Sequence, residues 1–145
     1  MPQEAKPSIP WIGYCLSCKY PAKTLEERGF TVLRFYHTGE GLEELKKRPY
    51  PIILVQDWLN DTQGVNLPSG IDVTDQIDIT SGVVRIIKSL ETQSNAKIIV
   101  PHHGTLDYLD SRLRQAGADK FVDLMGEHSL DELVRAVEDS LLVSP

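Results

Sequence analysis

The sequence lacks the features that mark membrane, secreted and nucleic-acid-binding proteins. None of its apolar runs approaches the roughly 18 residues that a helix needs to span a bilayer. Its opening stretch, MPQEAKPSIP, does not show the basic and then apolar order of a signal peptide. The net charge of −6 at pH 7 disfavours nucleic acid as the main partner, because phosphate contacts need a basic surface. We therefore expect a cytoplasmic protein that binds neither nucleic acid nor membrane.

Cysteine is scarce as well. The two cysteines, Cys15 and Cys18, are too few and too close together for a secreted disulfide scaffold. The remaining composition, 41% hydrophobic and 25% charged, is typical of a folded domain, and 145 residues suit one domain. Residues 1–10 carry three prolines and no hydrophobic periodicity. We expect them to form a flexible lead-in to a single domain over 11–145.

The clearest strand of the sequence is the run Ile52–Val55. Its four aliphatic residues follow Pro49 and Pro51, and such a bounded run predicts a strand that is buried on both faces. Asp57 comes just after it. Open parallel α/β sheets place their binding and catalytic residues at the carboxyl ends of their strands. Asp57 is therefore the first candidate for a functional residue.

Four further strands and five helices alternate around this run. The strands are expected over Trp11–Leu16, Thr31–Tyr36, Lys97–Val100 and Lys120–Leu124. The helices are expected over Pro21–Arg28, Gly41–Lys47, Gly82–Leu90, Leu106–Ala116 and Ser129–Leu142. Such alternation implies parallel strands with right-handed crossovers, hence a three-layer α/β/α sandwich.

A polar stretch at 61–80 separates the central strand from the next helix. Loops of this length in a compact domain are usually functional or mobile, so we treat it as an inserted loop. Four residues of one parity predict a short strand inside it, interrupted at Asp75: Ile71, Val73, Ile77 and Ile79. Its aspartates lack the glycine turn and final glutamate of a calcium loop, which predicts a solvated acidic loop.

Four stretches resemble the receiver domain of two-component response regulators, and the likeness covers most of residues 11–143. They are LEERGF at 25–30, GEGLEELKKRPYPIILVQDW at 39–58, SGVVRIIKSL at 81–90 and QAGADKFV at 115–122. The resemblance implies a flavodoxin-like fold with a five-stranded parallel sheet of order 2-1-3-4-5. It also places Asp57 at the position of the phospho-acceptor aspartate.

The residues that accompany the acceptor in that family are missing. An acidic pair at the end of the family's first strand helps to hold Mg²⁺, a hard cation that takes oxygen ligands. Here the corresponding residues are Cys15–Cys18, without a carboxylate. The family's hydroxyl residue falls near Pro101 or His102, and its lysine falls at Leu124. The resemblance therefore implies a degenerate pseudo-receiver in which conventional phosphorylation of Asp57 is doubtful.

Other residues are candidate neighbours of Asp57. Asp61 could replace a lost Mg²⁺ ligand; otherwise Asp57 is a solvated or helix-capping carboxylate. Trp58 either packs at the sheet edge or, if it is exposed, marks a contact surface. His102 and His103 would titrate near neutral pH if either lies near Asp57. Because no full ligand set is present, we expect no cofactor, with Mg²⁺ as the alternative.

The spacing of Cys15 and Cys18 supports a second interpretation. A CxxC motif at a strand-to-helix junction can be redox active, because a helix N-terminus lowers the pKa of the first thiol. The stretch CLSCKYPAKTLEERGF also resembles the opening of a glutaredoxin, over residues 11–36, but PIILVQDW fits the next part of that fold poorly. A zinc site with His102 and His103 is another alternative. The plainest alternative is a pair of half-buried thiols packed beneath the first helix.

We therefore predict a stand-alone receiver-like signalling module that acts by binding a protein partner, either a sensor kinase or a downstream effector. We expect no output domain and no enzymatic activity, and a homodimer is an alternative assembly. The resemblance implies a binding face over Leu106–Gln115 and Leu130–Val143, and the insertion at 61–80 is a second candidate surface. The alternative function is a small thiol-disulfide oxidoreductase with Cys15 as nucleophile and Cys18 as resolving cysteine. A nucleotide-binding domain ranks last, because no glycine-rich loop follows the first predicted strand.

Overall fold

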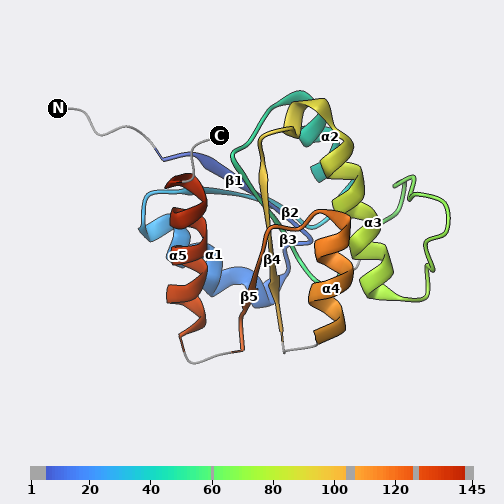
Figure 1. Ribbon diagram of the computed structural model, residues 1–145. Coiled ribbons are helices and arrows are strands. Elements are labelled where there is room, and N and C mark those ends of the chain that lie inside the picture. Colours follow the sequence, from blue (N-terminus) through green and yellow to red (C-terminus); the bar gives the residue numbers. More distant parts are fainter. Residues whose placement is uncertain (1–5, 60, 104–106, 126–127, 143–145) are drawn as a thin grey trace.

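Five parallel strands form the middle layer of the molecule, in the order β2-β1-β3-β4-β5 (Figure 1). The computed structural model describes residues 6–59, 61–103, 107–125 and 128–142, with side chains except at 107–110. The strands are β1 Ser8–Ile12, β2 Thr31–Phe35, β3 Ile52–Val55, β4 Lys97–His102 and β5 Lys120–Asp123. This order confirms the predicted flavodoxin-like fold.

Helices cover both faces of the sheet. In Figure 1, α1 and α5 lie on one face, and α2, α3 and α4 lie on the other. The helices are α1 Lys19–Glu27, α2 Thr38–Lys47, α3 Gln76–Ser89, α4 Asp107–Ala116 and α5 Ser129–Leu142. Two short 3₁₀ turns, η1 Leu16–Cys18 and η2 Glu91–Gln93, precede α1 and β4. No helix in the described ranges is long and apolar enough to cross a membrane.

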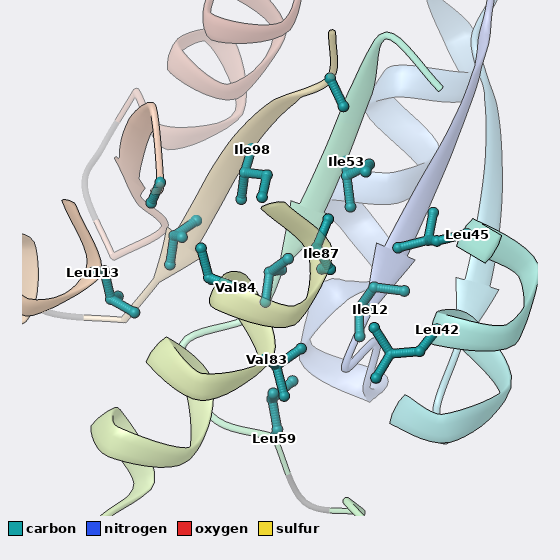
Figure 2. Packing of buried hydrophobic residues seen from close by; sticks show 14 of the residues in the cluster. Ile12, Leu42, Leu45, Ile53, Leu59, Val83, Val84, Ile87, Ile98 and Leu113 are labelled. Atoms are coloured by element: carbon teal, nitrogen blue, oxygen red, sulfur yellow. The ribbon is translucent and has the colours of Figure 1, made fainter. Parts of the chain in front are cut away.

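β3 joins the two halves of the hydrophobic core. All four of its side chains are fully buried. Ile53 and Val55 pack with α2 and α3, whereas Ile52 and Leu54 pack with α1 and α5. Figure 2 shows Ile53 beside Ile98 of β4 and Ile87 of α3. Each such side chain contributes about 1.5–3 kcal/mol through its removal from water, which explains why an unbroken aliphatic run occurs here.

The N-terminal part of the sheet differs from the prediction. Residues 8–10 belong to β1, so the expected lead-in over 1–10 is wrong for these three residues. Pro10 therefore lies inside a strand. It is accommodated because β1 pairs with β3 only from Trp11 onward, so the N–H that proline lacks falls outside that ladder. Residues 1–5 lie outside the described part of the chain.

The inserted loop is shorter than predicted. α3 begins at Gln76, so the segment without helix or strand spans 61–75, and Figure 1 shows it projecting beside α3. The short strand predicted from alternating apolar residues is absent: Ile77 and Ile79 lie in α3. The carboxylate of Asp75 accepts hydrogen bonds from the N–H groups of Ile77 at 3.0 Å and Asp78 at 3.3 Å. This N-cap starts the helix earlier than the apolar pattern indicated.

The prediction of a solvated acidic loop holds for the exposed Asp72 but not for Asp75 and Asp78, which are half-buried and paired. Arg112 of α4 donates to the carboxylate of Asp75 at 3.1 Å and also to that of Asp78. The second oxygen of Asp78 accepts from the N–H of Asp72 at 2.9 Å. These bonds hold the pKa of Asp78 below its usual range, with the Asp72 N–H as the largest cause. The end of the insertion is therefore fastened to α3 and α4.

β4 is also longer than predicted, because it continues through Pro101 to His102. Pro101 pairs with Val122 of β5, and its carbonyl accepts from the N–H of Asp57 at 3.3 Å. The N–H that proline lacks would point toward β3, beyond the last paired residues of that ladder, Leu54 and Ile99. Its absence therefore removes no bond from the paired part of the sheet.

Candidate functional site

Asp57 lies just past the C-terminal end of β3, where β1, β3 and β4 all terminate. Its backbone is fixed on two sides. The N–H donates to the carbonyl of Pro101 at 3.3 Å, and the carbonyl accepts from the hydroxyl of Thr80 at 2.8 Å. Its carboxylate accepts from the side-chain amide of Gln56 at 3.3 Å. Asp57 is thus tied to β4 and α3 through its backbone, and its half-buried carboxylate lies at the sheet edge.

The residues that face Asp57 from β1 are not the predicted ones. β1 ends at Ile12, which pairs with Val55, so that Gly13 and Tyr14 follow the strand beside Asp57. The run WIGYCL predicted a strand to Leu16. Gly13 ends it earlier, because its φ of 82° lies in the left-handed region. Neither Gly13 nor Tyr14 carries a carboxylate.

The packing around Gly13 explains why no larger residue occupies this position. A Cβ atom built at Gly13 would lie 2.4 Å from Cδ2 of Leu59 and 3.0 Å from Cβ of Gln56. Both distances are far below ordinary van der Waals contact. An aspartate at this position would therefore collide with the core as well as adopt a strained backbone.

Tyr14 provides an aromatic contact where receivers have an acid. Its ring meets the rings of Trp11 and Tyr36 edge-on, with centroids 5.9 Å and 5.4 Å away. The guanidinium of Arg34 lies 5.3 Å from the same ring. Burial raises the pKa of the Tyr14 phenol above its usual value, so this residue stays neutral near pH 7.

The two cysteines lie behind this edge, at the start of η1. Their sulfur atoms are 3.5 Å apart; Cys15 is half-buried and Cys18 is fully buried. The Cys18 thiol donates to Oε1 of Gln56 at 3.5 Å, and the indole N–H of Trp11 donates to the same oxygen at 2.9 Å. Burial raises the pKa of the Cys18 thiol to about 12. One thiol is therefore half-buried and the other fully buried, whereas the plainest of the sequence interpretations expected both to be half-buried.

Gln56 and Thr80 connect the site, and the sequence analysis missed both. Gln56 is only 2% exposed and bridges the Cys18 thiol to the Asp57 carboxylate. A polar residue directly after four buried aliphatic ones was a usable signal for Gln56, because a buried amide needs partners. Nothing in the sequence distinguishes Thr80 from any other threonine within a helix.

Asp61 is engaged elsewhere. Its carboxylate pairs with Nδ1 of His37 and accepts from the N–H of Gln63 at 3.0 Å. Its carbonyl accepts from the N–H of Thr38 at 3.1 Å. The hydrogen bond with Asp61 raises the pKa of His37, and that same bond lowers the pKa of Asp61. Asp61 therefore fastens the start of the insertion to the N-terminus of α2 and does not complete a metal site with Asp57.

The residues present do not fit a metal ion. Among the side chains that the structure describes, no three of the types His, Cys, Asp and Glu gather in a way that could hold one. All four residues of the zinc site considered above, Cys15, Cys18, His102 and His103, are described, and they do not gather in this way. Among the described residues at this edge, Asp57 offers a carboxylate to Mg²⁺, whereas Gly13 and Tyr14 offer none.

Comparisons with known proteins give one positive result. No family model and no curated protein matches the chain. Solved structures do match. A response regulator from Thermotoga maritima superposes with a TM-score of 0.70 at 16% identity, covering 95% of this chain and 99% of that one. An orphan response regulator of H. pylori gives 0.67 at 17% identity, covering 97% and 99%.

A third match is the receiver domain of a sensor histidine kinase from Pseudomonas aeruginosa, which holds a magnesium ion in its active-site cleft. Its TM-score is 0.70 at 16% identity, with 94% of this chain and 98% of that one covered. The chain has the fold of response-regulator receiver domains. The resemblance to receiver domains is thereby confirmed for the fold. The resemblance to a glutaredoxin is wrong, because the sheet is a five-stranded parallel one.

The other positions at this edge of the receiver fold also carry unusual residues. β4 ends in the buried His102, which lies opposite Asp123 and whose ring meets that of Phe121 edge-on at 6.4 Å. Leu124 follows β5 at the lysine position of receivers. The amine of Lys120 lies at the other end of β5, 3.5 Å from the carbonyl of Ala136. Among the described residues that follow β4 and β5, namely 103 and 124–125, none carries a hydroxyl or an amine, and Thr105 lies outside the described part of the chain.

Two exposed side chains complete the edge. Trp58 is 56% exposed, so of the two alternatives for this residue the contact surface is favoured over packing. His103 is exposed as well, just after β4. The candidate site therefore presents an aspartate, an indole and an imidazole to solvent, with a buried network of Gln56, Trp11 and Cys18 behind them.

Proposed function

We propose that this chain is a receiver-fold signalling module that acts through protein–protein contacts, without conventional phosphorylation of Asp57. The observation that carries the proposal is the end of β1. Gly13 has a left-handed backbone and no space for a Cβ atom, so the carboxylate that would share Mg²⁺ with Asp57 has no place there. Without that cation, the charge of an incoming phosphoryl group at Asp57 is not neutralised.

The receiver fold supports the signalling part of the proposal. The solved structures that match are named response regulators or the receiver domain of a sensor kinase. A partner of this chain would accordingly be a sensor kinase or a downstream effector. Fold likeness alone does not establish a role, so the proposal depends on the experiments below.

The face of α4, β5 and α5 is the first candidate for the partner surface. On it, the exposed Arg114 places its guanidinium 4.7 Å from the centroid of the half-buried Phe121 ring. Arginine and aromatic side chains are enriched where proteins bind one another. The insertion at 61–75 is the second candidate, since its Val73 is an exposed aliphatic side chain.

Amide NMR spectra in Mg²⁺, with and without beryllofluoride, test the loss of phosphorylation. Beryllofluoride mimics the phosphoryl group of an aspartyl phosphate. We expect no saturable shift at Asp57 or Thr80, whereas a receiver that has the conventional acidic pair should respond under the same conditions. Saturable shifts that centre on Asp57 and disappear in Asp57→Asn would refute this part of the proposal.

Capture experiments with the full chain test the interaction. We expect a sensor kinase or effector to bind wild type and Asp57→Asn equally, and to be lost in Arg114→Glu. The matched control is Arg48→Glu, which changes another exposed arginine at the end of α2, away from the candidate face. If Asp57→Asn abolishes binding while Arg114→Glu does not, the partner binds at the edge that carries Asp57 instead.

A further inference from the structure

Cys15, Cys18 and Gln56 form a chain of contacts that the proposed function does not use. The sulfur atoms of Cys15 and Cys18 are 3.5 Å apart. The Cys18 thiol contacts the amide oxygen of Gln56 at 3.5 Å, and the amide nitrogen of Gln56 contacts the Asp57 carboxylate at 3.3 Å. The half-buried Cys15 thus connects to the aspartate at the receiver edge through two buried side chains.

We propose that Cys15 and Cys18 are a site that low-molecular-weight disulfides oxidise reversibly to a disulfide. Through Gln56, this oxidation changes the hydrogen bonding of the Asp57 carboxylate. The backbone already holds both residues in one turn, since the N–H of Cys18 donates to the carbonyl of Cys15 at 2.9 Å. A disulfide needs a sulfur–sulfur distance of about 2.0 Å, so the two atoms must approach by roughly 1.5 Å. Side-chain rotation within the turn can supply a movement of that size.

The two thiols have different access to a reactant, which sets the order of the steps. Cys15 is half-buried, and Cys18 is fully buried with its thiol pKa raised to about 12 by that burial. The thiolate is the attacking form. Cys15 therefore attacks the small disulfide RSSR first: a bond forms between Cys15 and one sulfur, the RS–SR bond breaks, and RSH leaves with the proton that Cys15 gave up.

Cys18 completes the exchange. Its sulfur attacks the sulfur of Cys15, the mixed disulfide with R breaks, and the second RSH leaves with the proton of Cys18. Two protein thiols are thereby oxidised to one disulfide, and RSSR is reduced to two RSH, with no net change in protons. An excess of RSH reverses both steps.

Oxidation changes the surroundings of Gln56. The Cys18 S–H group, which donates to Oε1 of Gln56, no longer exists in the disulfide. That oxygen then keeps only the indole N–H of Trp11 as donor. Because the other end of the same amide contacts Asp57, a shift of the Gln56 side chain alters the hydrogen bonding of the carboxylate at the sheet edge.

Redox titration of the full chain tests the site directly. The protein is equilibrated in buffers of reduced and oxidised glutathione, quenched with acid, labelled with a maleimide and weighed intact. We expect oxidation to protect both thiols of a monomer from labelling together. Both should be labelled again when reduced glutathione is in excess. Two labelled thiols at the most oxidising ratio, or a disulfide-linked dimer, would overturn the proposal.

Single-cysteine variants test the order of attack. Cys18→Ser should accumulate a mixed disulfide of Cys15 with glutathione, because no resolving thiol remains. Cys15→Ser should stay unmodified while folded, because its remaining thiol is buried. Glutathione modification of Cys15→Ser as fast as that of Cys18→Ser would refute the order. Circular dichroism of both variants identifies any loss of fold, and the wild-type titration stands without them.

Amide and side-chain NMR spectra of the reduced and oxidised protein test the connection to Asp57. We expect the Trp11 indole N–H, the Gln56 side-chain amide and the Asp57 amide to shift, and Lys97, at the other end of the sheet, to stay unchanged. In Gln56→Leu the disulfide should still form while the shift at Asp57 is lost. An oxidised spectrum in which Gln56 and Asp57 do not move would refute the connection. These assays contain no phosphate mimic or partner, so they stand apart from tests of the proposed function.

Discussion

The middle of the sheet and the edge at which its strands end are built from different kinds of residues. In the middle, Ile52–Val55 fills both halves of the core with aliphatic side chains that are all fully buried. At the edge, Gln56 and His102 are buried too, but they are polar and hold specific contacts. The residues Ile52–Val55 could be replaced by other aliphatic residues of similar volume, whereas Gln56 and His102 each depend on particular neighbours.

This difference separates what the fold determines from what it leaves open. The match to the Thermotoga maritima response regulator at 16% identity shows that this fold forms from a sequence that shares few residues with that protein. At the edge, the residues that follow β1 are Gly13 and Tyr14, neither of which is acidic. Fold and chemistry are therefore set by different residues and can change independently.

Truncating a residue in the middle of the sheet should give the largest effect. Ile53→Ala removes a fully buried side chain between β4 and α3, and we expect the free energy of unfolding to fall by about 2–5 kcal/mol. Urea denaturation measures it. Leu16→Ala is the matched control, because Leu16 is 81% exposed and its loss should change stability by less than about 0.5 kcal/mol. Similar losses for both would contradict the assignment of the core.

Enlarging Gly13 should give the next largest effect and tests the edge itself. Gly13→Ala adds a strained backbone, about 1–2 kcal/mol, to a collision of its Cβ with Leu59, about 1–3 kcal/mol. Gly64→Ala is the matched control: its φ of 80° is similar, but nothing lies within 4 Å of the added Cβ. The difference between the two variants in urea denaturation isolates the collision. If the two lose equal stability, Leu59 moves aside and an acid could be accommodated after β1.

The sequence predicted the middle of the molecule better than its edge. The limits of β3 and α5 agree with the predicted ones, because their apolar patterns are long or strictly bounded. The end of β1 was placed too late, because WIGYCL reads as one apolar run and the positive φ of Gly13 is a tertiary requirement. Aspartate is a favoured N-cap residue, but the alternation of apolar residues from Ile71 to Ile79 predicts a strand across Asp75, where the structure has a helix start.

Removing the cap of α3 should have a moderate effect. Asp75→Ala removes both the hydrogen bonds to the helix N-terminus and the ion pair with Arg112, and we expect a loss of about 1 kcal/mol. Asp75→Asn keeps a capping oxygen and loses only the half-exposed ion pair, so it should lose clearly less. Thermal denaturation at pH 7 compares them. An equal loss in both variants would show that Arg112, and not the cap, fixes the end of the insertion.

The smallest expected effect is the pH dependence of the His37–Asp61 pair, which fastens the other end of the insertion. The pKa of His37 is raised above 6.5 by Asp61, so its contribution to stability is fully present below pH 6.5 and is lost as the pH rises through the folded-state pKa. The pKa of Asp61 is lowered below 3.8, so its contribution is present above pH 3.8 and is lost as the pH falls through the lowered value.

The pair should therefore stabilise the insertion most between pH 3.8 and 6.5. An NMR titration of the His37 ring protons should give a midpoint above 6.5 in wild type and a lower one in Asp61→Asn. Glu40→Gln is the control, because Glu40 is the weakest of the influences on this ring and should move the midpoint less. If Asp61→Asn leaves the midpoint unchanged, the Asp61 carboxylate does not hold His37, and the backbone hydrogen bond from Thr38 to Asp61 is what fastens the insertion at α2.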